Sequence, residues 1–138
     1  MKKVIVLFLC LVLVSCSTHQ KISTVEPLFK IIKSSQEQGG TFQFFETITE
    51  KNEFSMLSND PDLKNVVAAN DFATCNYALI NLGAKPDSGY AINVTLVAEM
   101  PDKIILKITE IKPETDNTEG SNPLFILKVR SKKALELQ

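Results

Sequence analysis

The chain has 138 residues and is nearly neutral, with 15 lysine and arginine side chains against 16 aspartate and glutamate side chains. This length suits one small domain that buries a single core. The balanced charge excludes the strongly basic overall surface that binds nucleic acid or anionic lipid headgroups.

The first residues have the pattern of a secretory signal. Lys2 and Lys3 form a short basic start, and an unbroken apolar run follows from Val4 to Val14. The run is too short to cross a bilayer as a helix, which needs roughly 20 apolar residues. A basic start followed by a short apolar run is typical of a signal peptide.

The apolar run ends in residues 13–16 (LVSC), which resemble the lipobox of bacterial lipoproteins. This resemblance implies a diacylglycerol group on the thiol of Cys16, cleavage before that residue, and a third acyl chain on its amine. Two or more acyl chains hold a protein firmly to a membrane. Cys10 is a poor second candidate, because the bulky Leu9 precedes it. The alternatives are an ordinary signal peptide cut elsewhere and a stray apolar N-terminus.

Processing at Cys16 would make the mature chain more acidic. It would remove fifteen residues, two of them lysines, and leave a formal charge of −3. The lipid would then provide the attachment to the membrane. In many lipoproteins of two-membrane bacteria, a residue other than Asp after the lipid site permits export to the outer membrane, and this chain has Ser17 there. The predicted location is therefore the bacterial cell envelope, at the outer membrane.

Composition divides the chain into four predicted segments. They are a lipoprotein signal peptide over 1–15, the lipidated cysteine and a tether over 16–26, a β domain over 27–130 and a polar C-terminal tail over 131–138. The polar tether carries the only histidine, His19, and no zinc-type spacing accompanies it.

Cysteine use is consistent with a fold that has no internal disulfide. After processing and lipidation only Cys75 remains as a thiol. A domain of about 120 residues can bury enough core without a disulfide. Cys75 lies in a strand-like run and is expected to be a small buried apolar residue; a reactive thiol is the alternative.

The domain begins with two predicted strands. Leu28–Lys33 is a short apolar strand, and Thr41–Ile48 returns as a second one. The polar loop between them ends in Gly39 and Gly40, whose permissive backbone suits a turn. The two strands are therefore expected to form a hairpin.

A short helix is predicted after the second strand. Thr49 is the expected N-cap, with Glu50 in the first turn, where a carboxylate suits the positive end of the helix. Phe54 and Leu57 are three residues apart and share one face. Pro61 ends the helix, because the residue before proline disfavours helical geometry.

The rest of the chain is mostly strand. Strand formers dominate four further segments, namely Thr74–Leu82, Tyr90–Leu96, Ile104–Thr109 and Leu124–Val129. An acidic, turn-rich loop is expected over Pro113–Pro123. Most connections are too short for crossovers, so the strands should be mostly antiparallel. The predicted fold is mainly β (α+β), a single small antiparallel sheet or sandwich-like domain of about six strands with one short helix.

The sequence carries no familiar catalytic motif. It has no nucleophile elbow, no P-loop, no His-Glu-x-x-His and no Cys-x-x-Cys. A hydrolytic triad needs a base, and the only histidine is in the tether. Glu46, Glu50 and Glu53 could form an acid–base pair, but a solvated face is the simpler interpretation. No enzyme, no cofactor and no metal site are predicted.

One loop stands out as a candidate binding element. It consists of Lys85, Pro86, Asp87, Ser88, Gly89 and Tyr90. Pro86 presets a turn, Asp87 and Ser88 can bond nearby backbone amides, and Gly89 can adopt positive φ. A stiff loop loses less entropy on binding, and tyrosine is common at interfaces. The alternative is a hairpin turn with the Tyr90 ring packed inside.

The segment Leu82–Ile92 resembles the Leu-Gly-x-Lys-x-Thr/Ser-Gly-Gly-Tyr-x-Ile core of the PrcB-like family, named for a subunit of a bacterial surface protease complex. Four further matches keep the family order: Phe44–Leu57, Asp71-Phe72, Glu110-x-x-Pro113 and Pro123–Ile126. Asp87-Ser88 stands where the family often has Thr/Ser-Gly. The resemblance covers roughly residues 28 to 130. It implies a non-catalytic lipoprotein that binds, and thereby stabilises or assists, a surface protease.

Two other functions stay open. Lys85–Ala91 is also loosely similar to the Asn-Pro-Thr-Thr-Gly-Tyr loop of chagasin-like cysteine protease inhibitors, although the leading Asn is absent. That similarity implies a loop that plugs an active-site cleft. The third function is a small hydrolase or ligand carrier, which a deep apolar pocket ringed by carboxylates would support.

Overall fold

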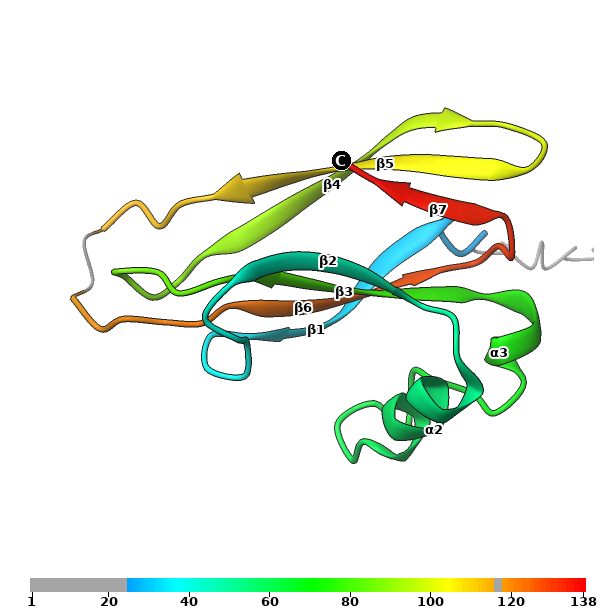
Figure 1. The fold of residues 1–138 in the computed structure, drawn as a ribbon, viewed down its shortest axis with the longest axis horizontal. Helices are drawn as coiled ribbons and strands as arrows, with labels where there is room; N and C mark the ends of the chain where they lie inside the picture. Colours follow the sequence, from blue (N-terminus) through cyan, green and yellow to red (C-terminus); the bar gives the residue numbers. More distant parts are fainter. Residues whose placement is uncertain (1–24, 116–117) are drawn as a thin grey trace, which may run out of the picture.

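Two β-sheets make up most of the structure (Figure 1). The computed structural model describes residues 25–115 and 118–138. Within these residues there are seven strands: β1 (Phe29–Ser35), β2 (Gln43–Ile48), β3 (Asn76–Leu82), β4 (Ala91–Glu99), β5 (Lys103–Ile111), β6 (Leu124–Val129) and β7 (Ala134–Leu137). The predicted mainly β fold class is confirmed.

The larger sheet has four antiparallel strands in the order β1-β6-β3-β2. The predicted hairpin of the first two strands is therefore wrong, since β1 and β2 lie at opposite edges. The central positions need strands that are apolar on both faces, and β3 and β6 are almost entirely buried. β1 and β2 each carry polar residues on one face, such as Lys30 and Glu46, and so occupy the edges.

The smaller sheet has three strands in the order β4-β5-β7. β4 and β5 form an antiparallel hairpin, and β7 pairs with β5 in parallel. The segment 131–138, predicted as a polar tail, thus contains a strand. Leu135 and Leu137 lie on the face that packs against the core, while Glu136 points outward and pairs with Lys103 at 2.9 Å.

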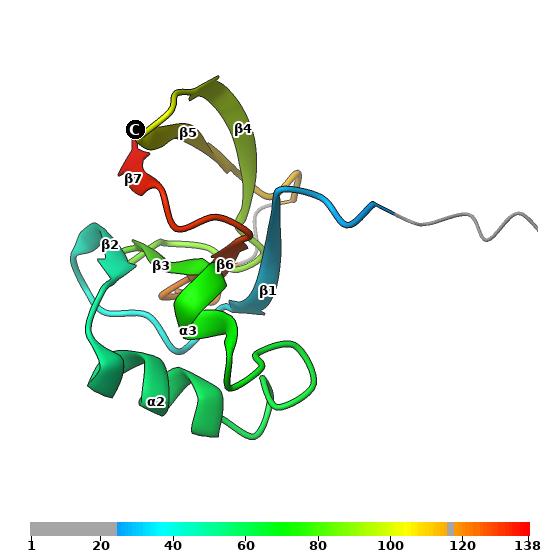
Figure 2. The same cartoon turned by 90° about the vertical axis from the view of Figure 1, so that its right-hand side faces the viewer.

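The core lies in two layers on either side of the larger sheet. Ala78, Ile80 and Leu82 of β3 face the smaller sheet, together with buried residues of β4, β5 and β6. Tyr77 points to the opposite face of the sheet, where its ring packs against Phe54 of the helical layer. The molecule therefore has three layers: a three-stranded sheet, a four-stranded sheet and a helical segment (Figure 2).

The helical layer is built around α2 (Lys51–Asn59). The N-cap is Glu50 rather than the predicted Thr49, and the carboxylate of Glu53 accepts a hydrogen bond from the Glu50 backbone N–H at 3.3 Å. A second helix of four residues, α3 (Asp71–Thr74), leads into β3 and was not predicted. Within the described residues no helix has the length and apolar character to span a membrane.

The two ends of the larger sheet have different surroundings. β1 begins at the end where residues 25–28 approach the domain, and it finishes beside the connections from β3 to β4 and from β5 to β6 (Figure 1). Seven strand residues place these ends roughly 20 Å apart. We call the first the tether end and the second the loop end.

Candidate functional site

The loop predicted to bind a partner lies at the loop end, but its tyrosine does not project into solvent. Tyr90 is 5% exposed and belongs to the core between the two sheets. Of the two alternatives that the sequence left open for this ring, the structure shows the packed one. Tyr90 therefore contributes to the core rather than to a contact surface.

The Lys85 side chain is also engaged in contacts within the fold. Its Nζ lies 2.7 Å from Oε2 of Glu110 and 5.4 Å from the centre of the Tyr90 ring. The Lys85 backbone pairs with Ser121 through hydrogen bonds of 2.8 and 3.0 Å. These contacts join the candidate loop to the segment before β6.

The remaining loop residues form a constrained tip, Pro86–Gly89. Gly89 has φ 95°, a left-handed conformation that favours glycine, as its position in the turn predicted. Pro86 and Gly89 are exposed, whereas Asp87 and Ser88 are half-buried. The Ser121 hydroxyl donates a hydrogen bond to the Asp87 carbonyl oxygen and so restrains the backbone of the tip.

Sequence reasoning missed the residue that holds this loop most directly, Gln36. Its side-chain oxygen accepts hydrogen bonds from the backbone N–H groups of Gly89 (2.9 Å) and Tyr90 (3.1 Å). Its amide nitrogen donates to the Tyr90 carbonyl oxygen at 2.8 Å. A polar residue in a loop more than fifty positions away gives no local signal of this role.

The tether end contains a buried ionic cluster centred on Asp71. The Asp71 carboxylate accepts hydrogen bonds from Nζ of Lys128 (2.7 Å), the hydroxyl of Tyr77 (2.7 Å) and the backbone N–H of Ala68 (2.8 Å). Burial alone would raise the pKa of Asp71, but these three donors together hold it below its usual range. The lowered pKa means that Asp71 favours its ionised form in the fold.

The partners of Asp71 are equally constrained. Burial, together with the hydrogen bond to Asp71, raises the pKa of the Tyr77 hydroxyl. Lys128 donates a second hydrogen bond to the Val66 carbonyl oxygen at 3.0 Å. Cys75 is buried, as predicted, with Sγ 4.0 Å from Asp71 Oδ1. This cluster ties β3, β6 and the helical layer together.

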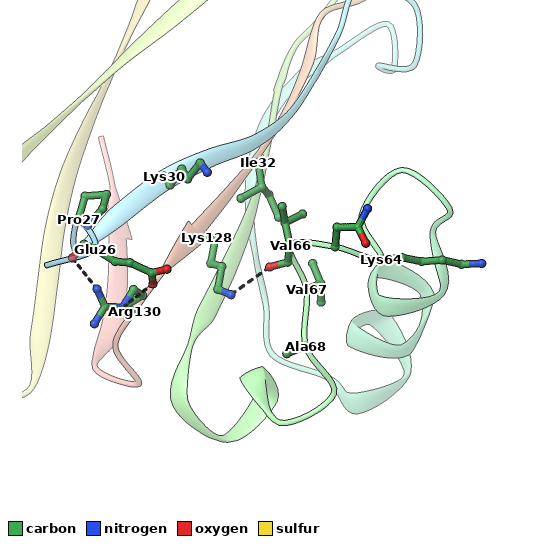
Figure 3. A pocket seen from close by; sticks show the side chains of 11 residues that line it. Glu26, Pro27, Lys30, Ile32, Lys64, Val66, Val67, Ala68, Lys128 and Arg130 are labelled. Carbon is green, nitrogen blue, oxygen red and sulfur yellow. Dashed lines mark hydrogen bonds and ion pairs between the residues drawn. The ribbon is translucent and has the colours of Figure 1, made fainter. Parts of the chain in front are cut away.

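A pocket of about 430 Å³ lies beside this cluster, between β1, β6 and the segment after α2 (Figure 3). Four of its lining residues are basic, namely Lys30, Lys64, Lys128 and Arg130, and Glu26 is the one acidic residue that lines it in the part of the chain that the structure describes. Arg130 pairs with Glu26 at 3.7 Å. The overall charge balance predicted no extended basic surface, yet this pocket concentrates positive charge locally.

A second pocket, of about 340 Å³, lies between β2 and α2. Its apolar lining residues include Ile48 and Leu57. Three carboxylates also line it, those of Glu46, Glu53 and Asp60. Asp60 pairs with Lys33 at 2.8 Å, and this hydrogen bond holds its pKa low. Glu53 caps α2. With two of the three carboxylates engaged in structural contacts, the pocket does not favour acid–base chemistry.

Residues 25–115 and 118–138 contain no group of three or more His, Cys, Asp or Glu side chains placed to hold a metal ion. Cys16, the predicted lipidation site, lies outside the described residues, as do the signal peptide and most of the tether. Their assignment stays a prediction from the sequence.

Comparison with known proteins adds no assignment. The chain matches no protein-family model, no curated protein and no solved structure. The likeness to the PrcB-like family therefore stays a prediction.

Proposed function

We propose that this chain is a non-catalytic lipoprotein of the bacterial envelope that binds another envelope protein as an accessory module. The favoured partner is a surface protease that the module stabilises or assists, as the resemblance to the PrcB-like family implies. Attachment through acyl chains on Cys16, at the outer membrane, is part of the proposal.

The observation that carries the proposal is the tip Pro86–Gly89 at the loop end. Gln36 and Ser121 restrain the tip from two different loops, and Pro86 remains exposed. A segment that is already ordered loses less conformational entropy when it binds. The tip also lies beside Gln36, at the end of β1 opposite the tether end, so a partner can reach it beside an anchored domain.

Site-specific crosslinking in intact cells tests this proposal. A photo-crosslinking residue replaces Pro86 at the tip, and a control replaces Met56, which is 77% exposed on α2. We expect an extracytoplasmic protein to be captured from position 86 and not from position 56. No capture at position 86, or equal capture at both positions, would contradict the proposal.

The membrane anchor is tested separately. We expect labelled palmitate to enter the wild-type chain and not the Cys16→Ala variant. Equal labelling of both chains, or of neither, would remove the anchor from the proposal without touching the crosslinking result.

A second candidate function is a protease inhibitor that uses the same loop in a chagasin-like manner. It is favoured by the gathering of the tip, the loop around Gln36 and the segment around Ser121 at one end of the fold. Because Tyr90 is buried and Lys85 is paired, Pro86–Gly89 is the part of the six-residue loop that could enter a cleft. Assays of the full chain against papain-like and subtilisin-like proteases decide; no inhibition at micromolar concentration excludes this function.

A further inference from the structure

The pocket at the tether end has an unusual arrangement of positive charge. Lys30 and Lys128 are direct partners across the antiparallel strands β1 and β6. Both line the pocket, so their side chains share one face of the sheet. Like charges placed opposite each other on neighbouring strands are destabilising. Within the described residues, an ion pair compensates only one of these two charges, that of Lys128.

Asp71 compensates Lys128 and fixes its position. The ammonium donates to Asp71 at 2.7 Å and to the Val66 carbonyl oxygen at 3.0 Å. An ammonium has three N–H donors, so these two bonds leave one donor. Lys30 has no ion-pair partner in the part of the chain that the structure describes. An anion between the two lysines would relieve their repulsion.

The pocket has room for more than a single ion. Its volume of about 430 Å³ is in the range of small-molecule sites. Ile32, Val66 and Val67 give it apolar walls next to the charged groups. Arg130, paired with Glu26 at 3.7 Å, adds a guanidinium whose planar donors suit phosphate oxygens.

We propose that this pocket binds a phosphate group, with Lys30, Lys128 and Arg130 as its donors. The phosphate can belong to a lipid headgroup or to a free phosphate anion, since both offer the same oxygens to these donors. The headgroup source rests on the proposed membrane anchor. Glu26, the last residue of the tether, and Pro27 line the pocket, and the eleven residues from Cys16 to Glu26 extend at most roughly 40 Å.

Binding is measured on the full chain in a non-ionic detergent, with inorganic phosphate as the first probe. We expect phosphate to raise the melting temperature and to shift the backbone NMR signals of Lys30 and Val66–Ala68. Lys30→Gln should weaken binding about fivefold, as the loss of one exposed charge contact of about 1 kcal/mol implies.

Lys64→Gln is the matched control, because it removes the same charge from the same pocket. In Figure 3 the Lys64 ammonium points away from Lys128 and Arg130. We therefore expect Lys64→Gln to bind phosphate nearly as well as wild type. Lys30→Glu, which reverses the charge and places a carboxylate opposite Lys128, should abolish phosphate binding, and its melting temperature without phosphate should not fall below that of wild type.

Soluble dihexanoyl-phosphatidylglycerol is the second probe and separates the two sources. Tighter binding of this lipid than of inorganic phosphate assigns the pocket to a headgroup, and the reverse order assigns it to free phosphate. The proposal is overturned if neither probe binds, or if Lys30→Gln and Lys64→Gln weaken binding equally. Neither probe needs a protein partner, so failure here is distinct from failure of the crosslinking test.

Discussion

The two ends of the larger sheet are ordered by different means. At the loop end, neutral hydrogen bonds from Gln36 and Ser121 hold the backbone around Gly89. At the tether end, the buried carboxylate of Asp71 holds Lys128 beside Lys30, which has no ion-pair partner among residues 25–115 and 118–138. One end is constrained in shape and the other is positive in charge. The difference teaches that a nearly neutral chain can hold an ordered tip at one end of a sheet and a locally positive pocket at the other.

Truncating Tyr90 should have the largest effect on the loop end. Because the ring is buried between the sheets, Tyr90→Ala should lower the free energy of unfolding by about 3 to 5 kcal/mol. Urea denaturation of the full chain measures this loss. Tyr90→Phe keeps the ring and should cost less than about 1 kcal/mol. If Tyr90→Ala instead left stability unchanged, the ring would be a surface group after all.

Removing Asp71 should have the next largest effect, and at the tether end. Asp71→Ala leaves the partly buried Lys128 ammonium without its partner and should lower the free energy of unfolding by about 3 kcal/mol. The measurement is again urea denaturation at neutral pH. Contacts at the loop end should be preserved, which NMR signals of Gly89 can check.

The same cluster predicts the direction of acid sensitivity. The pKa of Asp71 is lower in the folded chain than in the unfolded one. Its contribution is thus complete above the unfolded value of about 4, and it is lost as pH falls through the lower folded value. Thermal unfolding from pH 6 to pH 2 should show this loss in wild type and a shallower slope in Asp71→Asn. Equal slopes would mean that Asp71 does not govern acid stability.

A smaller effect is expected from Gly89. At φ 95° a side chain is strained, so Gly89→Ala should cost about 1 to 2 kcal/mol. Gly40→Ala is the control, because the φ of Gly40 is not positive and an added Cβ would meet only ordinary contacts. Gly89→Ala should also reduce crosslinking from position 86. An unchanged crosslink in a destabilised variant would separate tip conformation from partner binding.

Local patterns in the sequence predicted several elements well. The strand Leu124–Val129 has the bounds that were expected, and Gly89 has the positive φ that its turn position required. Phe54 and Leu57 are buried, as their shared helical face predicted. In each case a short segment contains enough apolar periodicity or turn chemistry to determine its own conformation.

Strand pairing and register could not be predicted from single segments of the sequence. Whether β1 pairs with β2 or with β6 depends on which strands are apolar on both faces. This requires a comparison of all the strands, because the most apolar ones take the central positions of the sheet. β7 was missed because four residues with charged neighbours give a weak strand pattern, although two leucines two positions apart were a usable signal. Lys30 and Lys128 lie opposite each other because of the register between β1 and β6, and the sequence of either strand alone does not determine that register.

The position of β1 has a mechanical consequence. The strand is at a sheet edge, pairs only with β6, and is continuous with the tether at one end and with Gln36 at the other. Tension on the tether along the strand axis would therefore load the β1–β6 hydrogen bonds together, in shear. If β1 slipped, Gln36 would be pulled away from Gly89 and Tyr90, so tension applied at the tether end would change the conformation of the tip at the loop end.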